Sequence, residues 1–146
     1  MCTASVAGPP RTAELVRVTI YNSTNTTLDI RSKSSNRNGT WTYDFDGDWR
    51  DSLKPEWVTR NTMENDINVS CDGNPNFDFG VAADITLTLR NMPITFKVQT
   101  HMNCLGQQSK HEVETPQNNG GCMVYSTKVN PNGLFDVVIA CFNKNL

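Results

Sequence analysis

Apolar and polar residues alternate along most of this chain, in short segments separated by clusters of Asn, Gly, Asp and Pro. Two of the clearest segments are ELVRVTIY at 14–21 and ITFKVQT at 94–100. The first places Val16, Val18 and Ile20 on one face, which is the pattern of a half-buried strand. No window shows a helical stripe of useful length, so the alternation predicts an all-β chain.

The same pattern predicts about nine or ten short strands. They span residues 14–21, 26–32, 40–45, 56–59, 66–71, 83–90, 94–100, 110–115, 122–129 and 134–142. The turn RNMP makes a hairpin of 83–90 and 94–100, and NPNG makes a second hairpin of 122–129 and 134–142. The polar segment 110–115 is predicted as an edge strand, and residues 1–13 as an irregular leader.

Short strands joined by short loops pair antiparallel, and two layers are needed to cover their apolar faces. The chain of 146 residues fits one domain. We therefore predict a single antiparallel β-sandwich over residues 14–146. No internal repeat of fixed period is visible, which argues against a propeller.

Composition and charge narrow the function classes. The formal net charge is −2 and the Lys and Arg residues are scattered, so nucleic acid is not an expected partner. No apolar run approaches the ~20 residues of a membrane-spanning helix. The N-terminal sequence lacks the long apolar region of a secretory signal, so we expect release without a classical signal peptide and action outside the cell.

The five cysteines form no C-x-x-C motif, and the chain has two histidines, so we expect no metal site and no cofactor. Two interpretations of the cysteines stay open. Cys71, Cys104, Cys122 and Cys141 make two disulfides in a secreted protein, or the thiols are free and mostly buried.

The segment TWTYDFDGDWRDSLKPEW, residues 40–57, is the most unusual stretch because it holds all three tryptophans and a series of carboxylates. An EF-hand that began at Asp44 would need Gly at the sixth position and Glu at the twelfth. Trp49 and Pro55 stand there instead. Asp-Gly is a common hairpin turn, which favours a turn over a calcium loop. Calcium binding by Asp44, Asp46 and Asp48 stays open.

Catalysis has little support in the sequence. A G-x-S-x-G nucleophile elbow is absent. The carboxylates of 44–51 could in principle hydrolyse a glycoside, and Cys104 could pair with His101 or His111. Asp on turns is ordinary, and His111 is expected to be an exposed edge-strand residue. We expect no enzymatic activity.

The aromatic residues of the same segment favour recognition of a ligand. Trp41, Tyr43 and Phe45 share one strand face and can equally be core residues, whereas Trp49 lies between two charged residues. A Trp in a polar turn is typical of contacts with lipid headgroups, sugars or a partner protein. Carboxylates beside aromatic faces also suit a cationic headgroup. The candidate ligand-binding residues are Trp41, Tyr43, Asp46, Asp48, Trp49 and Trp57.

Three stretches carry a resemblance to a known family: ELVRVTIYNSTNTTLDI, then NGTW after a loop, then INVSCDG. This order resembles the aegerolysins, small acidic all-β proteins. Asn22, the Gly39–Trp41 pair and the Cys71-Asp72-Gly73 run hold the places of the family's strand-ending Asn, Gly-aromatic step and Cys-Gly turn. The resemblance covers residues 14–80 by pattern.

The resemblance implies a protein that binds particular membrane lipids and is not an enzyme. Some members of the family act with a second, larger protein component to form cytolytic or insecticidal pores. The residues leave two other classes open. One is a lectin-like module that binds a glycan through the same aromatics. The other is a secreted structural protein whose exposed edge strand pairs with a second copy in a homo-oligomer.

Overall fold

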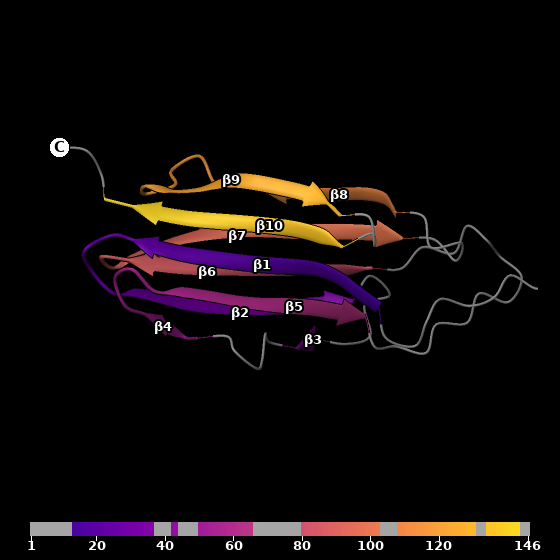
Figure 1. Ribbon diagram of the computed structural model, residues 1–146, viewed down its shortest axis with the longest axis horizontal. Helices are drawn as coiled ribbons and strands as arrows, with labels where there is room; N and C mark the ends of the chain where they lie inside the picture. The colour runs from indigo at the N-terminus through magenta and orange to yellow at the C-terminus, as the bar shows by residue number, and fades with distance from the viewer. Residues whose placement is uncertain are drawn as a thin grey trace, which may run out of the picture.

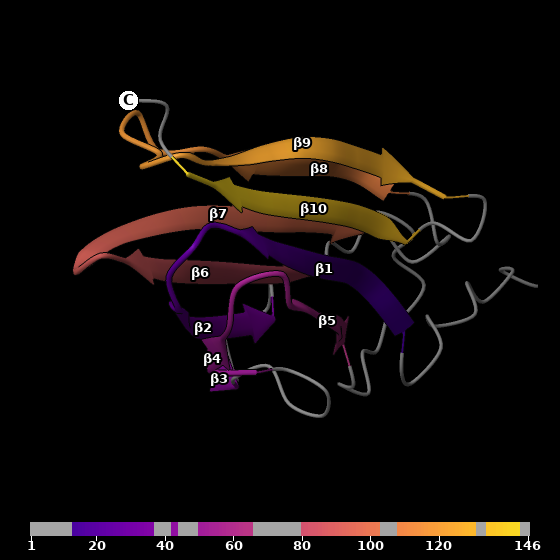
Figure 2. The same cartoon turned by 60° about the vertical axis from the view of Figure 1, so that its left-hand side comes forward.

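A computed structural model of the chain describes residues 13–36, 42–43, 50–65, 80–102, 108–130 and 134–143. Two β-sheets face each other (Figures 1 and 2). The predicted all-β sandwich is therefore confirmed. The strands are β1 Ala13–Ser23, β2 Leu28–Asn36, β3 Thr42–Tyr43, β4 Ser52–Leu53, β5 Val58–Asn65, β6 Val81–Leu89, β7 Met92–Met102, β8 Gln108–Glu114, β9 Cys122–Val129 and β10 Phe135–Phe142.

The four-stranded sheet has the order β5-β1-β10-β9, and the larger sheet has the order β3-β2-β6-β7-β8, with β4 also paired to β2. The strand β8 lies at the end of its sheet order, as predicted for an edge strand. Both predicted hairpins are confirmed, because β6 pairs with β7 and β9 with β10 in antiparallel register. Arg90 and Asn91 both have positive φ, so they form the two-residue turn that suits a β-hairpin.

The pairing of β1 with β10 is parallel, which differs from the predicted all-antiparallel sandwich. It brings Val16 next to Phe135 and Ser23 next to Phe142, so the first and last described strands lie side by side in the centre of the sheet. Two strands that far apart in sequence need no short turn between them, so they can run in the same direction.

The predicted inward positions form the core. Val16, Val18 and Ile20 of β1 are fully buried, and Ile85, Leu87, Ile94, Phe96 and Val98 of the β6–β7 hairpin are buried as well. These side chains belong to one cluster with residues of β10, so the core lies between the two sheets. Removal of this apolar surface from water is the main stabilising contribution of such a layer.

Two strands in the middle of the chain differ from their predicted bounds. The weak strand expected at 56–59 is the eight-residue β5, Val58–Asn65. Its inward positions are occupied by Met63 and by the polar residue Thr59, which is 3% exposed. A search for alternating apolar residues therefore underestimates the length of β5. The short β4 was not predicted, and it pairs Leu53 with Leu28 of β2. The predicted strand 66–71 and residues 1–12 of the predicted leader 1–13 lie outside the described residues, and Ala13, the last residue of that leader, begins β1.

Candidate functional site

Most of the candidate residues from the sequence cannot be placed. Trp41, Asp46, Asp48 and Trp49 lie outside the described residues, as does Asp44 of the calcium alternative. Tyr43 belongs to β3, which pairs with Ser34 and Ser35 of β2, but its side chain is outside the described part. Trp57 is the member of the set whose surroundings are defined.

Trp57 lies on the surface immediately before β5, with 39% of its area exposed. The Arg50 guanidinium carbon lies 4.6 Å from the centroid of its ring, and the Lys54 ammonium lies 5.1 Å from it. Both cations are attracted by the electron-rich ring faces. This corner of the molecule therefore presents an aromatic ring with two cations of the chain beside it, in a segment where Asp51 and Glu56 are also exposed.

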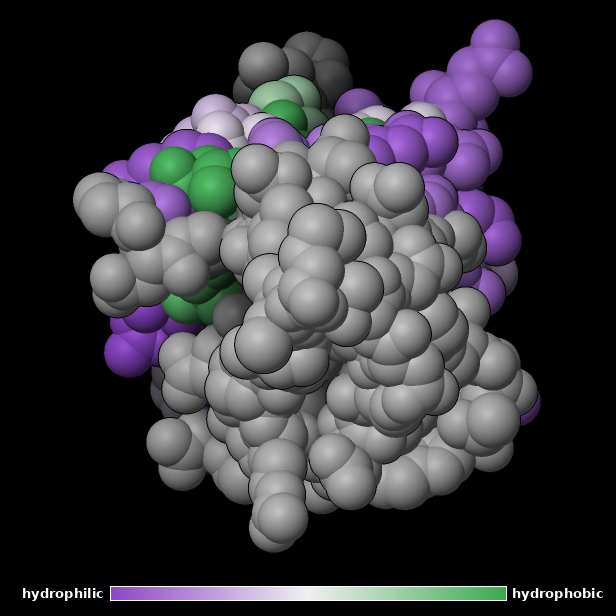
Figure 3. Space-filling model, turned by 90° about the vertical axis from the view of Figure 1, so that its right-hand side faces the viewer, coloured by the Kyte–Doolittle hydropathy of each residue, from purple (hydrophilic) through white to green (hydrophobic). Residues whose placement is uncertain are grey.

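Exposed apolar side chains gather with Trp57 at one end of the sandwich. The strands β1, β6 and β10 end there, and β5, β7 and β9 begin there, which is the left side of Figure 1. We call this the apolar end and define it by six residues, each with 38% to 46% of its area exposed: Tyr21, Trp57, Val58, Met92, Met123 and Phe142. Figure 3 faces the opposite end, where the described residues visible around the margin are coloured both purple and green.

The register explains how three of these side chains, Tyr21, Val58 and Met123, come to lie in one row on the outer face of the four-stranded sheet. Val58 of β5 pairs with Tyr21 of β1, Tyr21 with Ala140 of β10, and Ala140 with Met123 of β9. Ile20 and Asn22 on either side of Tyr21 are buried, so Tyr21 points outward. The result is an apolar row across all four strands.

Asn22 holds the turns of the apolar end together from inside. Its Nδ2 donates to the Thr26 carbonyl at 2.9 Å and to the Leu53 carbonyl at 2.7 Å. Its Oδ1 accepts from the Thr24 backbone N at 3.0 Å and from the Thr24 hydroxyl at 2.6 Å. Its backbone N donates to the Trp57 carbonyl, and its carbonyl accepts from the Glu56 N. With 1% of its area exposed, Asn22 is a buried hub that fixes the position of Trp57.

A second set of contacts fixes the other side of the apolar end. The Phe142 N donates to the Gly121 carbonyl at 2.9 Å, and the Asn25 N donates to Asn143 Oδ1 at 3.0 Å. Gly120 has a φ of +57°, and a Cβ there would lie 2.6 Å from Ile94 Cδ1. The positive φ therefore favours glycine in the turn before β9, and a larger residue would also have to displace the end of the Ile94 side chain.

A disulfide joins Cys122 and Cys141, which are direct cross-strand partners of β9 and β10. Both cysteines are fully buried. The sequence left open whether the cysteines form disulfides or remain free thiols, and for Cys122 and Cys141 the structure shows a disulfide. Cys71 and Cys104 lie outside the described residues. The bond links the residues directly before Met123 and Phe142, so it holds these two exposed side chains in fixed positions.

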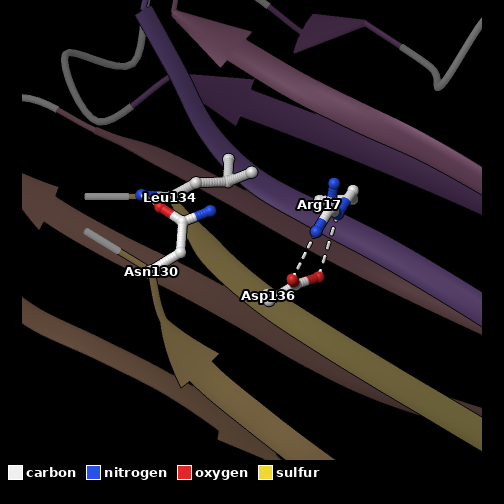
Figure 4. A network of polar contacts seen from close by, with 4 residues as sticks. All are labelled: Arg17, Asn130, Leu134 and Asp136. Carbon is white, nitrogen blue, oxygen red and sulfur yellow. Dashed lines mark hydrogen bonds and ion pairs between the residues drawn. The ribbon is translucent and has the colours of Figure 1, made fainter. Parts of the chain in front are cut away.

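Charged residues begin one register step away from the apolar row. Arg60 opposes Thr19, and the next row joins Arg17 to Asp136 and Asp136 to Lys128. The Arg17 guanidinium and the Asp136 carboxylate point toward each other across β1 and β10, with Nε donating to Oδ1 at 3.0 Å (Figure 4). This hydrogen bond from Arg17 lowers the pKa of Asp136, and the charges of Arg17, Lys128 and Arg60 lower it further against the opposing effect of burial.

The outer face of the larger sheet has a different character. A groove of about 1030 Å³ crosses β2, β6 and the start of β7. Its walls carry side chains of both charge signs and hydroxyl groups, among them Asp29, Arg31, Lys33, Asp84, Thr86 and Thr88. Lys97 pairs with Asp84 at 3.6 Å on the same face. Charges of both signs are therefore mixed on this face, and no excess of one sign develops.

Across the described part of the chain, His, Cys, Asp and Glu side chains nowhere gather in threes as a metal ion would require. The same residues contain no helix long and apolar enough to cross a membrane. His111, as predicted, is an exposed residue of β8, and its ring centroid lies 5.1 Å from that of Phe135.

Comparison with known proteins gives no relative: no family model, no curated protein and no solved structure matches this chain. The residues themselves therefore carry the functional argument.

Sequence reasoning missed Tyr21, Met123 and Phe142, although a signal for them exists. In ELVRVTIY the inward phase is Val16, Val18 and Ile20, so Tyr21 is an aromatic residue on the outward phase. LFDVVIACF is apolar on both phases, which places Val138 and Phe142 outside. Single exposed apolar residues are normal on a protein surface, so the signal lies in several of them falling at the same end of neighbouring strands.

Proposed function

We propose that the protein binds the interface of a lipid membrane through its apolar end. The observation that carries this proposal is that six of the eight exposed large apolar side chains of the described residues lie at one end of the sandwich, while Tyr125 and Val129 lie farther along β9. Trp and Tyr suit the boundary between headgroups and acyl chains because each ring has an apolar body and one polar group. The resemblance to aegerolysins agrees with this proposal.

The free energy available from these side chains is moderate. Full burial of a large apolar side chain contributes about 1.5–3 kcal/mol, so covering the exposed two-fifths of each contributes about 1 kcal/mol. Six such contributions amount to about 6 kcal/mol, from which the free-energy cost of the lost translational and rotational freedom must be subtracted. The apolar end by itself thus supports weak, reversible attachment.

Rigidity favours this use of the apolar end. The turns that carry Trp57 and Phe142 are held by the Asn22 hub and by the Cys122–Cys141 disulfide. A contact surface that is already ordered loses little conformational entropy on binding. The exposed side chains therefore contribute most of their burial energy to attachment.

Co-sedimentation with liposomes tests the proposal. Met123→Ser removes an apolar side chain from the apolar end, and Val129→Ser is a matched control on the same strand, since the two residues are 42% and 37% exposed. Loss of about 1 kcal/mol corresponds to about fivefold weaker binding for Met123→Ser. No change is expected for Val129→Ser. Absence of binding to every lipid mixture, or equal losses in both variants, would contradict the proposal.

A second candidate function is recognition of a glycan, and the groove on β2, β6 and β7 favours it. Carboxylates, cations and hydroxyl groups line this groove and could exchange hydrogen bonds with sugar hydroxyls. A glycan array tests this function, with Asp84→Asn and Thr86→Val expected to remove any signal. Glycan binding that persists in these variants would place the sugar elsewhere.

A further inference from the structure

From the charges beside the apolar end we infer that this end binds a bilayer containing anionic phospholipid. We also infer that the bound molecule is tilted so that the outer face of β5-β1-β10-β9 is turned toward the bilayer. This inference rests on the proposed function and adds a headgroup class and an orientation to it. The residues that carry it are Arg60 and Lys128, both exposed on that face.

The first argument is an excess of positive charge. Arg17, Arg60 and Lys128 all act on the single carboxylate of Asp136 and lower its pKa. Arg17 donates two hydrogen bonds to that carboxylate, so the carboxylate is already neutralised by one cation. Arg60 and Lys128 then add positive charge to this part of the face. Beside Trp57 the exposed Asp51 and Glu56 balance Arg50 and Lys54, so the excess of positive charge rests on Arg60 and Lys128.

The second argument is distance along the strands. Side chains on one face of a strand repeat every two residues, or about 6.6–6.8 Å. Arg60 is therefore one step, about 7 Å, from the apolar row, and Lys128 is two steps, about 14 Å, from it. The headgroup region on each side of a bilayer is about 5–8 Å thick. If Tyr21 and Met123 lie at the boundary of the acyl chains and the strands run close to the membrane normal, Arg60 lies at the level of the lipid phosphates.

Lys128 lies above the headgroups in this orientation but within reach of their field. The negative surface potential of an anionic membrane falls off within a Debye length, about 10 Å at moderate salt. The long side chains of Arg and Lys also extend toward the phosphates. Both residues therefore favour an anionic surface over a neutral one.

The third argument is the contrast with the other sheet. On the outer face of β2, β6 and β7 charges of both signs are mixed, as in the Lys97–Asp84 pair. A face with mixed charges is attracted only weakly by an anionic membrane. Because of this charge difference, the bound molecule is expected to tilt so that the outer face of β5-β1-β10-β9, and not that of β2-β6-β7, is turned toward the bilayer.

The experiment compares two vesicle compositions, phosphatidylcholine alone and phosphatidylcholine with phosphatidylserine. The variants are Arg60→Ser, Lys128→Ser and the charge-conserving Lys128→Arg. The matched control is Lys33→Ser, an exposed cation of β2 on the opposite face. A basic residue near an anionic surface contributes about 1 kcal/mol, which equals about a fivefold change in binding.

We expect Arg60→Ser and Lys128→Ser each to weaken binding to phosphatidylserine vesicles about fivefold and to leave binding to neutral vesicles unchanged. Lys128→Arg and Lys33→Ser should bind as the unaltered protein does. Added salt should reduce the difference between the two compositions. Thermal unfolding of every variant controls for loss of structure.

Three results would overturn the inference. One is equal binding to both compositions, and another is a loss in Lys33→Ser as large as that in Lys128→Ser. Either of these leaves the proposed function intact, whereas absence of binding to every vesicle removes both. The third is full competition by inorganic phosphate at constant ionic strength, which would indicate a site for a free anion in place of a membrane surface.

Discussion

The buried amide of Asn22 shows how one polar residue determines the shape of the apolar end. Its side chain exchanges hydrogen bonds with Thr24 and Thr26 of the turn between β1 and β2 and with Leu53 of β4. In the sequence, Asn22 stands in an Asn-Ser-Thr sequon and ends an alternating segment. A turn at this position could be predicted from the sequence. The partner from residue 53 could not, because the pairing of β4 with β2 depends on a long-range contact.

Replacement of Asn22 by Ala should lower the free energy of unfolding by about 2–3 kcal/mol, because it leaves buried groups without partners. Asn25→Ala is the matched control, since Asn25 is an exposed residue of the same turn. It should change stability by less than about 0.5 kcal/mol. Urea unfolding measures both, and a similar small effect for the two variants would contradict the role of Asn22 as a hub.

The Arg17–Asp136 pair makes the free energy of unfolding depend on pH in the acidic range. Because the hydrogen bond from Arg17 depresses the pKa of Asp136 below 3.8 in the folded protein, the pair stabilises the protein above that pH. The contribution is lost as the pH falls from about 3.8 through the folded pKa. At neutral pH, Asp136→Asn should lower stability by about 1–2 kcal/mol.

Urea unfolding of the protein and of Asp136→Asn over a range of pH tests this linkage. The difference between them should be constant near neutrality and should shrink below about pH 4. A difference that grows on acidification would show that the pair does not stabilise the charged carboxylate.

At the scale of elements, local hairpins could be predicted and distant pairings could not. The β6–β7 and β9–β10 hairpins follow from alternation on both sides of a short turn. The strand β5 was underestimated because Thr59 occupies an inward position where the pattern calls for an apolar residue. The parallel contact of β1 with β10 joins the two ends of the domain, and no local signal encodes it.

The disulfide between β9 and β10 should stabilise the hairpin that carries Met123 and Phe142. The two cysteines are 19 residues apart, and closing a loop of that size contributes about 3 kcal/mol. A double variant, Cys122→Ala with Cys141→Ala, should therefore unfold at lower urea. Peptide mapping of the unaltered protein without reductant should yield a peptide pair linked through these residues. Unlinked peptides would contradict the assignment.

At the scale of the whole molecule, different surfaces have different properties. The apolar end supplies burial energy, the outer face of β5-β1-β10-β9 supplies positive charge, and the outer face of β2-β6-β7 carries mixed charges and a groove. The formal net charge of −2 gives no hint of this division. Of the residues first expected to bind a ligand, Trp57 is the one that the described structure places in the candidate site.

Hydrogen exchange in the presence of vesicles tests the central claim, binding through the apolar end, most directly. With phosphatidylcholine–phosphatidylserine vesicles, the account predicts slower amide exchange in the turns of the apolar end, residues 54–57, 90–91 and 115–121. Exchange along the groove strands β2 and β6 should stay unchanged. Slower exchange in β2 and β6 with none at the three turns, or no change in a protein that co-sediments with the vesicles, would contradict it.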